Sequence, residues 1–164
     1  MNKYILILGV FGYFIIGNYT GFAEESQKAG KQFLVDQQER KEEIRKNLSK
    51  LLEKLKTAKG ERKWHLIYDL GYSEDKRAVE PLIKIVEDED ESLEYRLIAI
   101  QSLGMNGNNK NKSIQVLEKV LKNEKFQLTS AHALLELGER KIAWPILVET
   151  LKKGKNIVLT FGEL

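Results

Sequence analysis

The feature of this chain that most constrains its fold is a Leu-Gly pair that recurs at nearly constant spacing. The pairs are Leu70-Gly71, Leu103-Gly104 and Leu137-Gly138, separated by 33 and 34 residues. An apolar run at helical spacing precedes each pair, and a short polar segment follows it. A period of this length is typical of stacked helical hairpins, each of which buries its apolar face only against its neighbours. The spacing therefore predicts an all-α fold, a short α-solenoid of about three hairpins.

Residues 1–23 have the composition of a secretory signal peptide. Lys3 is their only charge, Tyr4–Ile16 is apolar apart from glycines, and Gly21 and Ala23 are the small residues that signal peptidase accepts. An uncleaved membrane anchor is the alternative, but a membrane span needs about 20 apolar residues. We therefore expect cleavage after Ala23 and export to the periplasm or the extracellular space. The chain has no cysteine, so an exported form would depend on its apolar core rather than on disulfides.

The charge of the chain is dense but balanced. There are 27 Lys and Arg residues against 24 Asp and Glu residues, which gives a formal net charge of +3. Such a balance favours solubility and provides no field that would predict nucleic acid or an anionic membrane as a partner.

Residues 24–60 form a charged segment with one apolar stripe, which we call the lead helix. No proline or glycine interrupts the sequence from 32 to 58. The apolar side chains recur at intervals of four and three residues, at Ile44, Leu48, Leu51, Leu55 and Ala58. This pattern predicts an amphipathic helix. We expect it to cap the first hairpin, since the ends of solenoids need covering; a dimeric coiled coil is the alternative, although only about two heptads are present.

Residues 61–153 form the repeat domain, and residues 154–164 form an apolar tail. We expect first helices at about 61–70, 93–103 and 128–137, and second helices at about 76–86, 112–121 and 141–151. Each first helix is predicted to stop at Gly71, Gly104 or Gly138 in a left-handed C-cap. The segment 104–112 is rich in glycine and asparagine, so we expect it to be a mobile loop.

Three further residues or pairs have local structural interpretations. Asp75 is placed to cap the first of the second helices. Pro81 and Pro145 lie one turn into their helices, where each removes a backbone hydrogen bond, so we expect bent or 3₁₀-like opening turns. Arg96 is predicted either to reach an acidic group or a free carbonyl of a neighbouring repeat or to remain solvated.

The order of motifs resembles a known family. Residues 75–83 read Asp-Lys-Arg-Ala-Val-Glu-Pro-Leu-Ile, followed by an acidic turn, Tyr95-Arg96 and Leu103-Gly104. This order is similar to the HEAT-like repeats of the bilin-lyase type, and the resemblance covers residues 61–153. It weakens in the second repeat, where Ser113 and Val116 replace the alanine and the proline. The resemblance implies a right-handed helical stack used for protein contact, and it does not imply bilin chemistry.

The candidate metal ligands do not form a site in the sequence. His65 and His132 share a repeat register two units apart, which places them roughly 20 Å from each other, too far for one metal ion. The acidic run Glu87–Glu91 departs from a calcium loop, because Leu93 and Ala99 stand where glycine and glutamate are required. We interpret this run as a solvated turn, with a weak ion site or a contact for a basic partner as alternatives. We expect both histidines to be partly buried.

No nucleophile arrangement, dinucleotide fingerprint or phosphate loop is present in the sequence. The sequence therefore predicts no catalytic residue, no cofactor and no metal, and a protein that is not an enzyme.

The candidate partner surface lies on the second helices, which the family resemblance places on the concave side of the stack. The predicted surface residues are Glu80, Lys84, Gln115, Lys119, Trp144 and Val148. Trp144 stands at a register where the other two repeats carry polar residues. It is either a partner-binding anchor or is covered by the tail segment 157–161, and we favour the tail.

These observations favour an exported, non-catalytic scaffold that binds a protein partner whose identity the sequence does not give. Two alternatives remain, a lyase-type enzyme accessory or chaperone and an envelope structural protein that oligomerises through the lead helix. Self-association through the lead helix or through an unsealed C-terminal end is a further expectation.

Overall fold

The computed structural model describes residues 4–8, 14–17 and 20–152, and the chain divides into two units, residues 1–43 and 44–164. In the first unit, β1 (Tyr4–Leu8) pairs antiparallel with β2 (Phe14–Gly17). Helix α1 (Thr20–Leu55) begins there and continues into the second unit. Within the described ranges, none of the helices combines the length and the apolar character that crossing a membrane requires.

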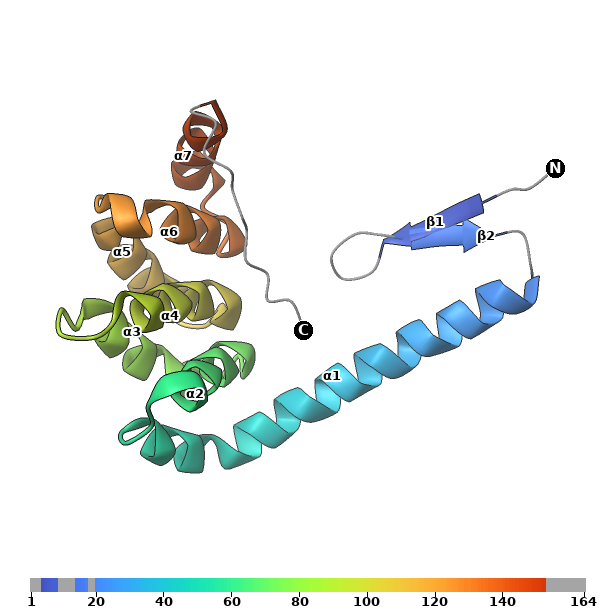
Figure 1. The fold of residues 1–164 in the computed structure, drawn as a ribbon, viewed down its shortest axis with the longest axis horizontal. Coiled ribbons are helices and arrows are strands. Elements are labelled where there is room, and N and C mark those ends of the chain that lie inside the picture. The colour runs from blue at the N-terminus through green and yellow to red at the C-terminus, as the bar shows by residue number, and fades with distance from the viewer. Residues whose placement is uncertain (1–3, 9–13, 18–19, 153–164) are drawn as a thin grey trace. The chain divides into compact units, whose positions relative to one another are not determined.

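The second unit is a stack of helical hairpins, as predicted (Figure 1). After the end of α1, its elements are α2 (Gly60–Tyr72), the 3₁₀ helix η1 (Lys76–Ala78), α3 (Val79–Glu87), α4 (Leu93–Asn106), α5 (Lys110–Val120), α6 (Glu124–Glu136) and α7 (Arg140–Lys152). The first helices α2, α4 and α6 pack on one another in sequence, while α3 packs on α4 and α5 packs on α6. The fold class is therefore an all-α repeat solenoid.

One continuous core runs through this stack. Each helix contributes an apolar stripe, and leucines of successive repeats are fully buried, including Leu70, Leu82, Leu103, Leu117 and Leu134. The end of α1 covers the first hairpin, because Leu48 is fully buried and Leu52 and Leu55 pack against the core. The predicted capping helix is thus confirmed, although α1 ends at Leu55 rather than near Ala58.

The Leu-Gly glycines have two different roles, which corrects the prediction that all three end their helices. Gly71 and Gly104 lie inside α2 and α4, so they are not caps. A Cβ built on Gly71 would lie 2.6 Å from Ser102 Cβ, and one built on Gly104 would lie 2.8 Å from Ala133 Cα. Both glycines therefore allow successive first helices to touch. Only Gly138 has the predicted left-handed conformation, with φ of +96°.

The cap at Gly138 is a Schellman motif. The Gly138 amide donates to the carbonyl of Leu135, and the Glu139 amide donates to the carbonyl of Leu134 at 2.8 Å. Ala133, which contacts Gly104, follows Ser102 by 31 residues, whereas Gly138 follows Gly104 by 34 residues. The third Leu-Gly pair is therefore not structurally equivalent to the first two, despite its nearly equal spacing.

The predicted local features mostly hold. The Asp75 carboxylate accepts a hydrogen bond from the Arg77 amide, which confirms the cap. The 3₁₀ turn η1 precedes Pro81 as expected, but α7 is α-helical from Arg140 across Pro145. Arg96 Nε donates to the carbonyl of Val86 at 3.0 Å, which satisfies the end of α3.

The expected mobile loop at 104–112 was wrong. Helix α4 continues to Asn106 and α5 begins at Lys110, which leaves only residues 107–109 between them. Gly107 takes the left-handed conformation that ends α4, and Asn106 is buried.

Candidate interaction surfaces

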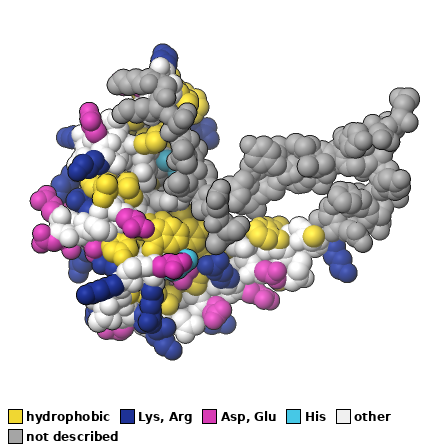
Figure 2. Space-filling view, viewed as in Figure 1, with side chains coloured by type: hydrophobic (Ala, Val, Ile, Leu, Met, Phe, Trp, Pro, Cys, Tyr) yellow, Lys and Arg dark blue, Asp and Glu magenta, His cyan; other side chains and the backbone are white. Residues whose placement is uncertain are grey.

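The exposed face of α3 and α5 carries four of the predicted surface residues. Glu80 and Lys84 are exposed on α3, and Gln115 and Lys119 are exposed on α5. Viewed as in Figure 1, charged side chains of both signs lie along the edge that these two helices form, whereas hydrophobic side chains gather nearer the centre of the visible face (Figure 2).

Two ion pairs connect α3 to α5 on this face. Lys112 contacts Glu80, and Lys119 Nζ lies 3.0 Å from Glu87 Oε1. Both pairs join residues 32 positions apart, so they link one repeat to the next. Exposed pairs of this kind contribute between zero and about 1 kcal/mol to stability. They place side chains of both signs next to one another on successive repeats. We call the face formed by α3 and α5 the polar face.

Helix α7 continues the stack with a different chemistry. Trp144 is 60% exposed and Leu151 is 62% exposed, and Val148 is partly exposed. These three side chains follow the i, i+4, i+7 spacing and therefore share one side of α7. The exposure of Trp144 does not match a covered side chain, but the tail segment expected to cover it lies outside the described residues.

An aromatic stripe on α2 was missed by the sequence analysis. The rings of Trp64 and Tyr68 stack with centroids 5.7 Å apart, and those of Tyr68 and Tyr72 stack at 6.3 Å. All three side chains are partly exposed. The signal was the spacing of four residues between the aromatic positions, which places them on one side of a helix. Trp64 and Tyr68 also pack against the core, so the stripe supports α2 as well as facing solvent.

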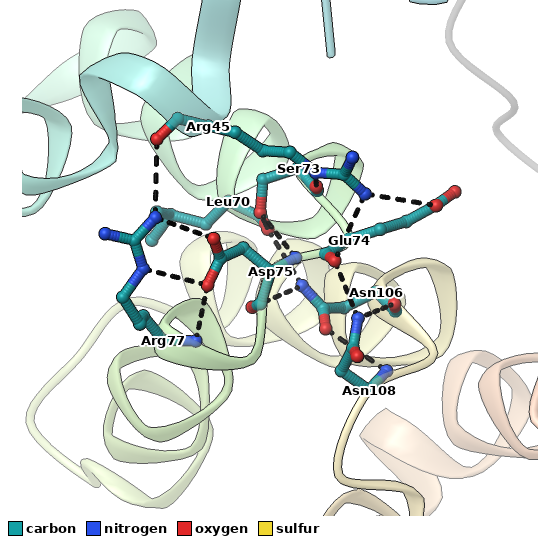
Figure 3. Close-up of polar contacts among 8 residues, drawn as sticks. All are labelled: Arg45, Leu70, Ser73, Glu74, Asp75, Arg77, Asn106 and Asn108. Carbon is teal, nitrogen blue, oxygen red and sulfur yellow. Dashed lines mark hydrogen bonds and ion pairs between the residues drawn. The ribbon is translucent and has the colours of Figure 1, made fainter. Parts of the chain in front are cut away.

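A polar network joins the turn after α2 to the neighbouring elements (Figure 3). Asn106 Nδ2 donates to the carbonyls of Leu70 and Asp75, both at 3.2 Å. Arg45 Nε, from α1, donates to the carbonyl of Ser73 at 2.8 Å. The network satisfies backbone carbonyls around the turn, and it fixes the cap, the first repeat and the second repeat against one another.

Asp75 anchors one edge of this network. Its carboxylate accepts two hydrogen bonds from the Arg77 side chain, at 3.0 and 2.7 Å. The Arg77 side chain holds the pKa of Asp75 below its ordinary value, by hydrogen bonding and by its charge. Arg77 Nη2 also donates to the carbonyl of Arg45 at 3.4 Å. This cluster has a structural role, because the Arg77 side chain pairs with the Asp75 carboxylate and with a backbone carbonyl.

The two histidines have separate surroundings. The side chain of His65 is 54% exposed and lies 3.5 Å from Glu61, so the expectation that it would be partly buried was wrong. His132 is largely buried on α6, and its Nδ1 lies 3.7 Å from Glu136 Oε1. Burial lowers the pKa of His132 and raises the pKa of Glu136 to about 7. In the part of the chain that the structure describes, no group of three potential ligands could hold a metal ion.

The acidic run between α3 and α4 makes local contacts. Glu91 contacts Lys63 of α2, and its carboxylate also accepts a hydrogen bond from the Ser92 amide at 3.2 Å. Asp88 accepts from the Asp90 amide at 3.0 Å, and Ser92 caps α4 by accepting from the Tyr95 amide. These contacts define a turn that starts α4.

Comparison with known proteins decides the family. A family model described as HEAT repeats matches residues 48–138, which is more than half of the chain. The chain belongs to the HEAT repeat family. No curated protein and no solved structure matches it. The match does not single out the bilin-lyase type, so that part of the resemblance remains a prediction. HEAT repeats are helical scaffolds that often serve protein interaction, and the family is generally non-catalytic.

The limits of the HEAT match coincide with changes in the structure. The match begins at Leu48, whose side chain is fully buried against the stack, and ends at Gly138, ahead of α7. The polar face lies wholly inside the matched HEAT region, whereas Trp144, Val148 and Leu151 lie beyond it. The six predicted surface residues therefore divide between four polar positions in the HEAT repeats and two positions on the final helix.

Proposed function

We propose that this HEAT repeat protein is an exported, non-catalytic scaffold that binds a protein partner through its second helices. The binding surface comprises Glu80, Lys84, Gln115, Lys119, Trp144 and Val148. The observation that carries the proposal is the pair of ion pairs that link α3 to α5. They bring side chains of opposite charge from successive repeats together on one exposed face, and a partner with complementary charges could contact both repeats at once.

The chemistry of the polar face favours a specific, polar protein contact. Lys84 lies four residues after Glu80 on α3, and Gln115 lies three residues after Lys112 on α5. Lys84 and Gln115 therefore lie along the same faces as the inter-repeat ion pairs. A partner that presents acceptors and charges of both signs would fit this pattern, whereas a lipid surface would require one predominant sign.

Binding can be tested by site-specific photocrosslinking of the full chain in its own host. A photoreactive residue at Lys84 or Gln115 is expected to capture one discrete partner, and the same residue at Lys125, which is exposed on α6, is the matched control. The charge reversal Lys84→Glu should reduce capture at Gln115, and Lys125→Glu should leave it unchanged. Equal capture from all three positions would contradict the assignment of the surface.

Export is supported by the composition of residues 1–23. Intact mass spectrometry of the chain from the envelope or extracellular fraction is expected to give a product that begins at Glu24. A full-length chain in the cytoplasmic fraction would contradict export.

A second function is favoured by one observation on α1. Phe33, Leu34 and Val35 are 50%, 58% and 48% exposed, an unusual run of three adjacent apolar side chains. We propose as the alternative that the lead helix mediates self-association in a structural role. Light scattering on the full chain and on a Phe33→Ser, Leu34→Ser variant separates the two functions. An oligomer that the variant abolishes would favour the structural role, and a monomer in both cases would exclude it.

A further inference from the structure

Helix α4 ends in the only Asn-Gly pair of the sequence, Asn106-Gly107. The fold uses both residues. Gly107 takes the left-handed conformation that ends the helix, with φ of +66°, and glycine adopts it without strain. Asn106 supplies the buried amide that donates to the carbonyls of Leu70 and Asp75. Asn-Gly is also a sequence prone to deamidation, because glycine has no side chain to keep its backbone nitrogen away from the asparagine side chain.

We propose that Asn106 is a deamidation site that the folded stack protects and the unfolded chain exposes, and that deamidation prevents the stack from closing again. The unfolded chain would thereby carry a permanent mark, and a marked molecule would be excluded from the folded population. This site depends on no partner of the polar face.

The reaction needs only water and hydroxide. The Gly107 backbone nitrogen loses its proton to hydroxide and attacks Cγ of Asn106. The new N–Cγ bond forms, the Cγ–Nδ2 bond breaks, and Nδ2 leaves as ammonia with a proton from water, which gives a five-membered succinimide. Water then opens the ring. Opening at Cγ gives aspartate, and opening at the main-chain carbonyl carbon of Asn106 gives isoaspartate, in which the side-chain carbons become part of the backbone.

The folded structure blocks the first step of this reaction (Figure 3). Attack requires the Asn106 side chain and the peptide that joins it to Gly107 to rotate against each other. The side chain is held by its two Nδ2 hydrogen bonds, and its Oδ1 accepts from the Asn108 amide at 3.3 Å. The peptide is held as well, because Asn108 Nδ2 donates to the main-chain carbonyl of Asn106 at 3.2 Å. Asn106 is 1% exposed, which also limits the access of hydroxide and water.

A deamidated chain loses the same contacts that provide this protection. The amide becomes a carboxylate, which accepts but does not donate, and which would face the carbonyl oxygens of Leu70 and Asp75. Burying a charge against two acceptors costs more than the loss of the hydrogen bonds alone. Isoaspartate also lengthens the backbone at the end of α4, which moves Gly107 away from its position as the cap. Both products therefore oppose closure of the turn between the first and second repeats.

Peptide mapping of the natural full chain tests the protection. The chain is incubated at pH 8, either folded or in guanidinium chloride above its unfolding transition. Trypsin then releases residues 97–110, which also contain Asn108 and Asn109. In the unfolded chain, tandem mass spectrometry is expected to find deamidation at Asn106 ahead of both neighbours. In the folded chain, deamidation at Asn106 is expected to be about tenfold slower or more, because only the opened fraction of molecules reacts.

Two controls accompany this measurement. A sample digested without incubation gives the background, and a synthetic peptide of residues 97–110, with and without guanidinium chloride, corrects for the effect of the denaturant on the reaction itself. Equal corrected rates at Asn106 in the folded and unfolded chains would overturn the proposal. So would an unfolded chain in which Asn106 reacts no faster than Asn108 and Asn109.

The consequence for folding is tested with substitutions that need no incubation. Urea unfolding at pH 8 compares Asn106→Asp with Asn106→Ala, which removes the same hydrogen bonds without adding a charge. We expect the folding equilibrium constant of Asn106→Asp to be lower than that of Asn106→Ala by about tenfold or more, or Asn106→Asp not to fold at all. Asn108→Asp is the matched control for charge, because the contact of Asn108 with Glu74 is exposed. The proposal fails if Asn106→Asp is as stable as Asn106→Ala, or if Asn108→Asp loses as much stability as Asn106→Asp.

Discussion

The absence of a side chain at Gly71 and Gly104 allows the first helices to approach closely. We expect Gly71→Ala to lower the free energy of unfolding by about 2 kcal/mol or more, because the new methyl group would lie 2.6 Å from Ser102 Cβ and 2.7 Å from Ser102 Cα. Since one of these atoms is backbone, relief requires α2 and α4 to move apart. Urea unfolding followed by circular dichroism at 222 nm measures the loss.

The control for this prediction is Gly30→Ala on α1, where no atom lies within 4 Å of the added Cβ. Alanine is favoured over glycine inside a helix by up to about 1 kcal/mol, so this variant should be neutral or slightly more stable. A similar loss for both variants would show that close approach is not the function of Gly71.

A second prediction at this scale concerns the pH dependence of stability. Burial raises the pKa of Glu136 from an ordinary value of 4.5 to about 7, so the folded state holds this proton more tightly than the unfolded state. The resulting stabilisation is present below about pH 4.5 and is lost as the pH rises through about 7. We expect Glu136→Gln to be more stable than the natural chain at pH 8, by about 1 kcal/mol after allowance for solvent screening, and nearly equal to it at pH 5.

Urea midpoints at both pH values test this expectation. Glu118→Gln, which removes an exposed carboxylate from α5, controls for the change in net charge. His132 acts in the opposite sense, because burial lowers its pKa and its protonation at low pH favours unfolding. Because its pKa lies below 6.5, His132 is neutral at pH 8 in both chains and does not contribute to the difference expected there. A Glu136→Gln benefit that is the same at pH 5 and pH 8 would contradict the assignment.

At the scale of elements, the turn after α2 depends on Asn106 at the end of α4. Asn106 donates to two carbonyls and is 1% exposed. We expect Asn106→Ala to cost about 1 to 2 kcal/mol, because two hydrogen bonds of a buried side chain are lost while Ser73 Oγ and the Ala78 amide still donate to the carbonyls of Leu70 and Asp75. Thermal unfolding by calorimetry measures the effect.

Asn108→Ala is the matched comparison. Asn108 Nδ2 donates to the carbonyl of Glu74 at 2.7 Å, but this contact is exposed and water can replace it. Its loss should cost less than about 1 kcal/mol. Equal losses at Asn106 and Asn108 would indicate that burial does not set the cost.

The order and number of the hairpins could be predicted from the sequence because each helix carries its own apolar stripe. The cap at Asp75 was also predictable, since its partner Arg77 is two residues away. The end of α4 could not be predicted from the sequence. Gly104 has a local preference for a helix cap, but packing against α6 holds it inside α4. The network around Asn106 joins residues 31 and 36 positions apart, and no local signal indicates such a contact.

For the candidate surface too, one part could be predicted from the sequence and another part could not. The exposure of Glu80, Lys84, Gln115 and Lys119 follows from helical periodicity, which the sequence displays. The pairing of Lys112 with Glu80 and of Lys119 with Glu87 depends on the offset between α3 and α5, which is a property of the assembled stack. The aromatic spacing on α2 was available in the sequence and was overlooked.

At the scale of the repeat stack, the two ends differ. At the first hairpin, Ile44 and Leu48 of α1 are 8% and 0% exposed and cover the core. At the last hairpin, α7 leaves Trp144 and Leu151 largely exposed. A solenoid requires covering at both ends, so the described residues provide a complete cap at the first end only.

The last prediction tests that cap. A chain that begins at residue 59 lacks Ile44, Arg45 and Leu48, and we expect its unfolding free energy to fall by about 4 kcal/mol, since each buried aliphatic side chain contributes about 1.5 to 3 kcal/mol. A chain that begins at residue 42 keeps these contacts and is the matched control, expected to retain the stability of the longer chain. Urea unfolding at equal protein concentration compares them. If the chain from residue 59 is as stable as the chain from residue 42, the end of α1 is an appendage rather than part of the solenoid.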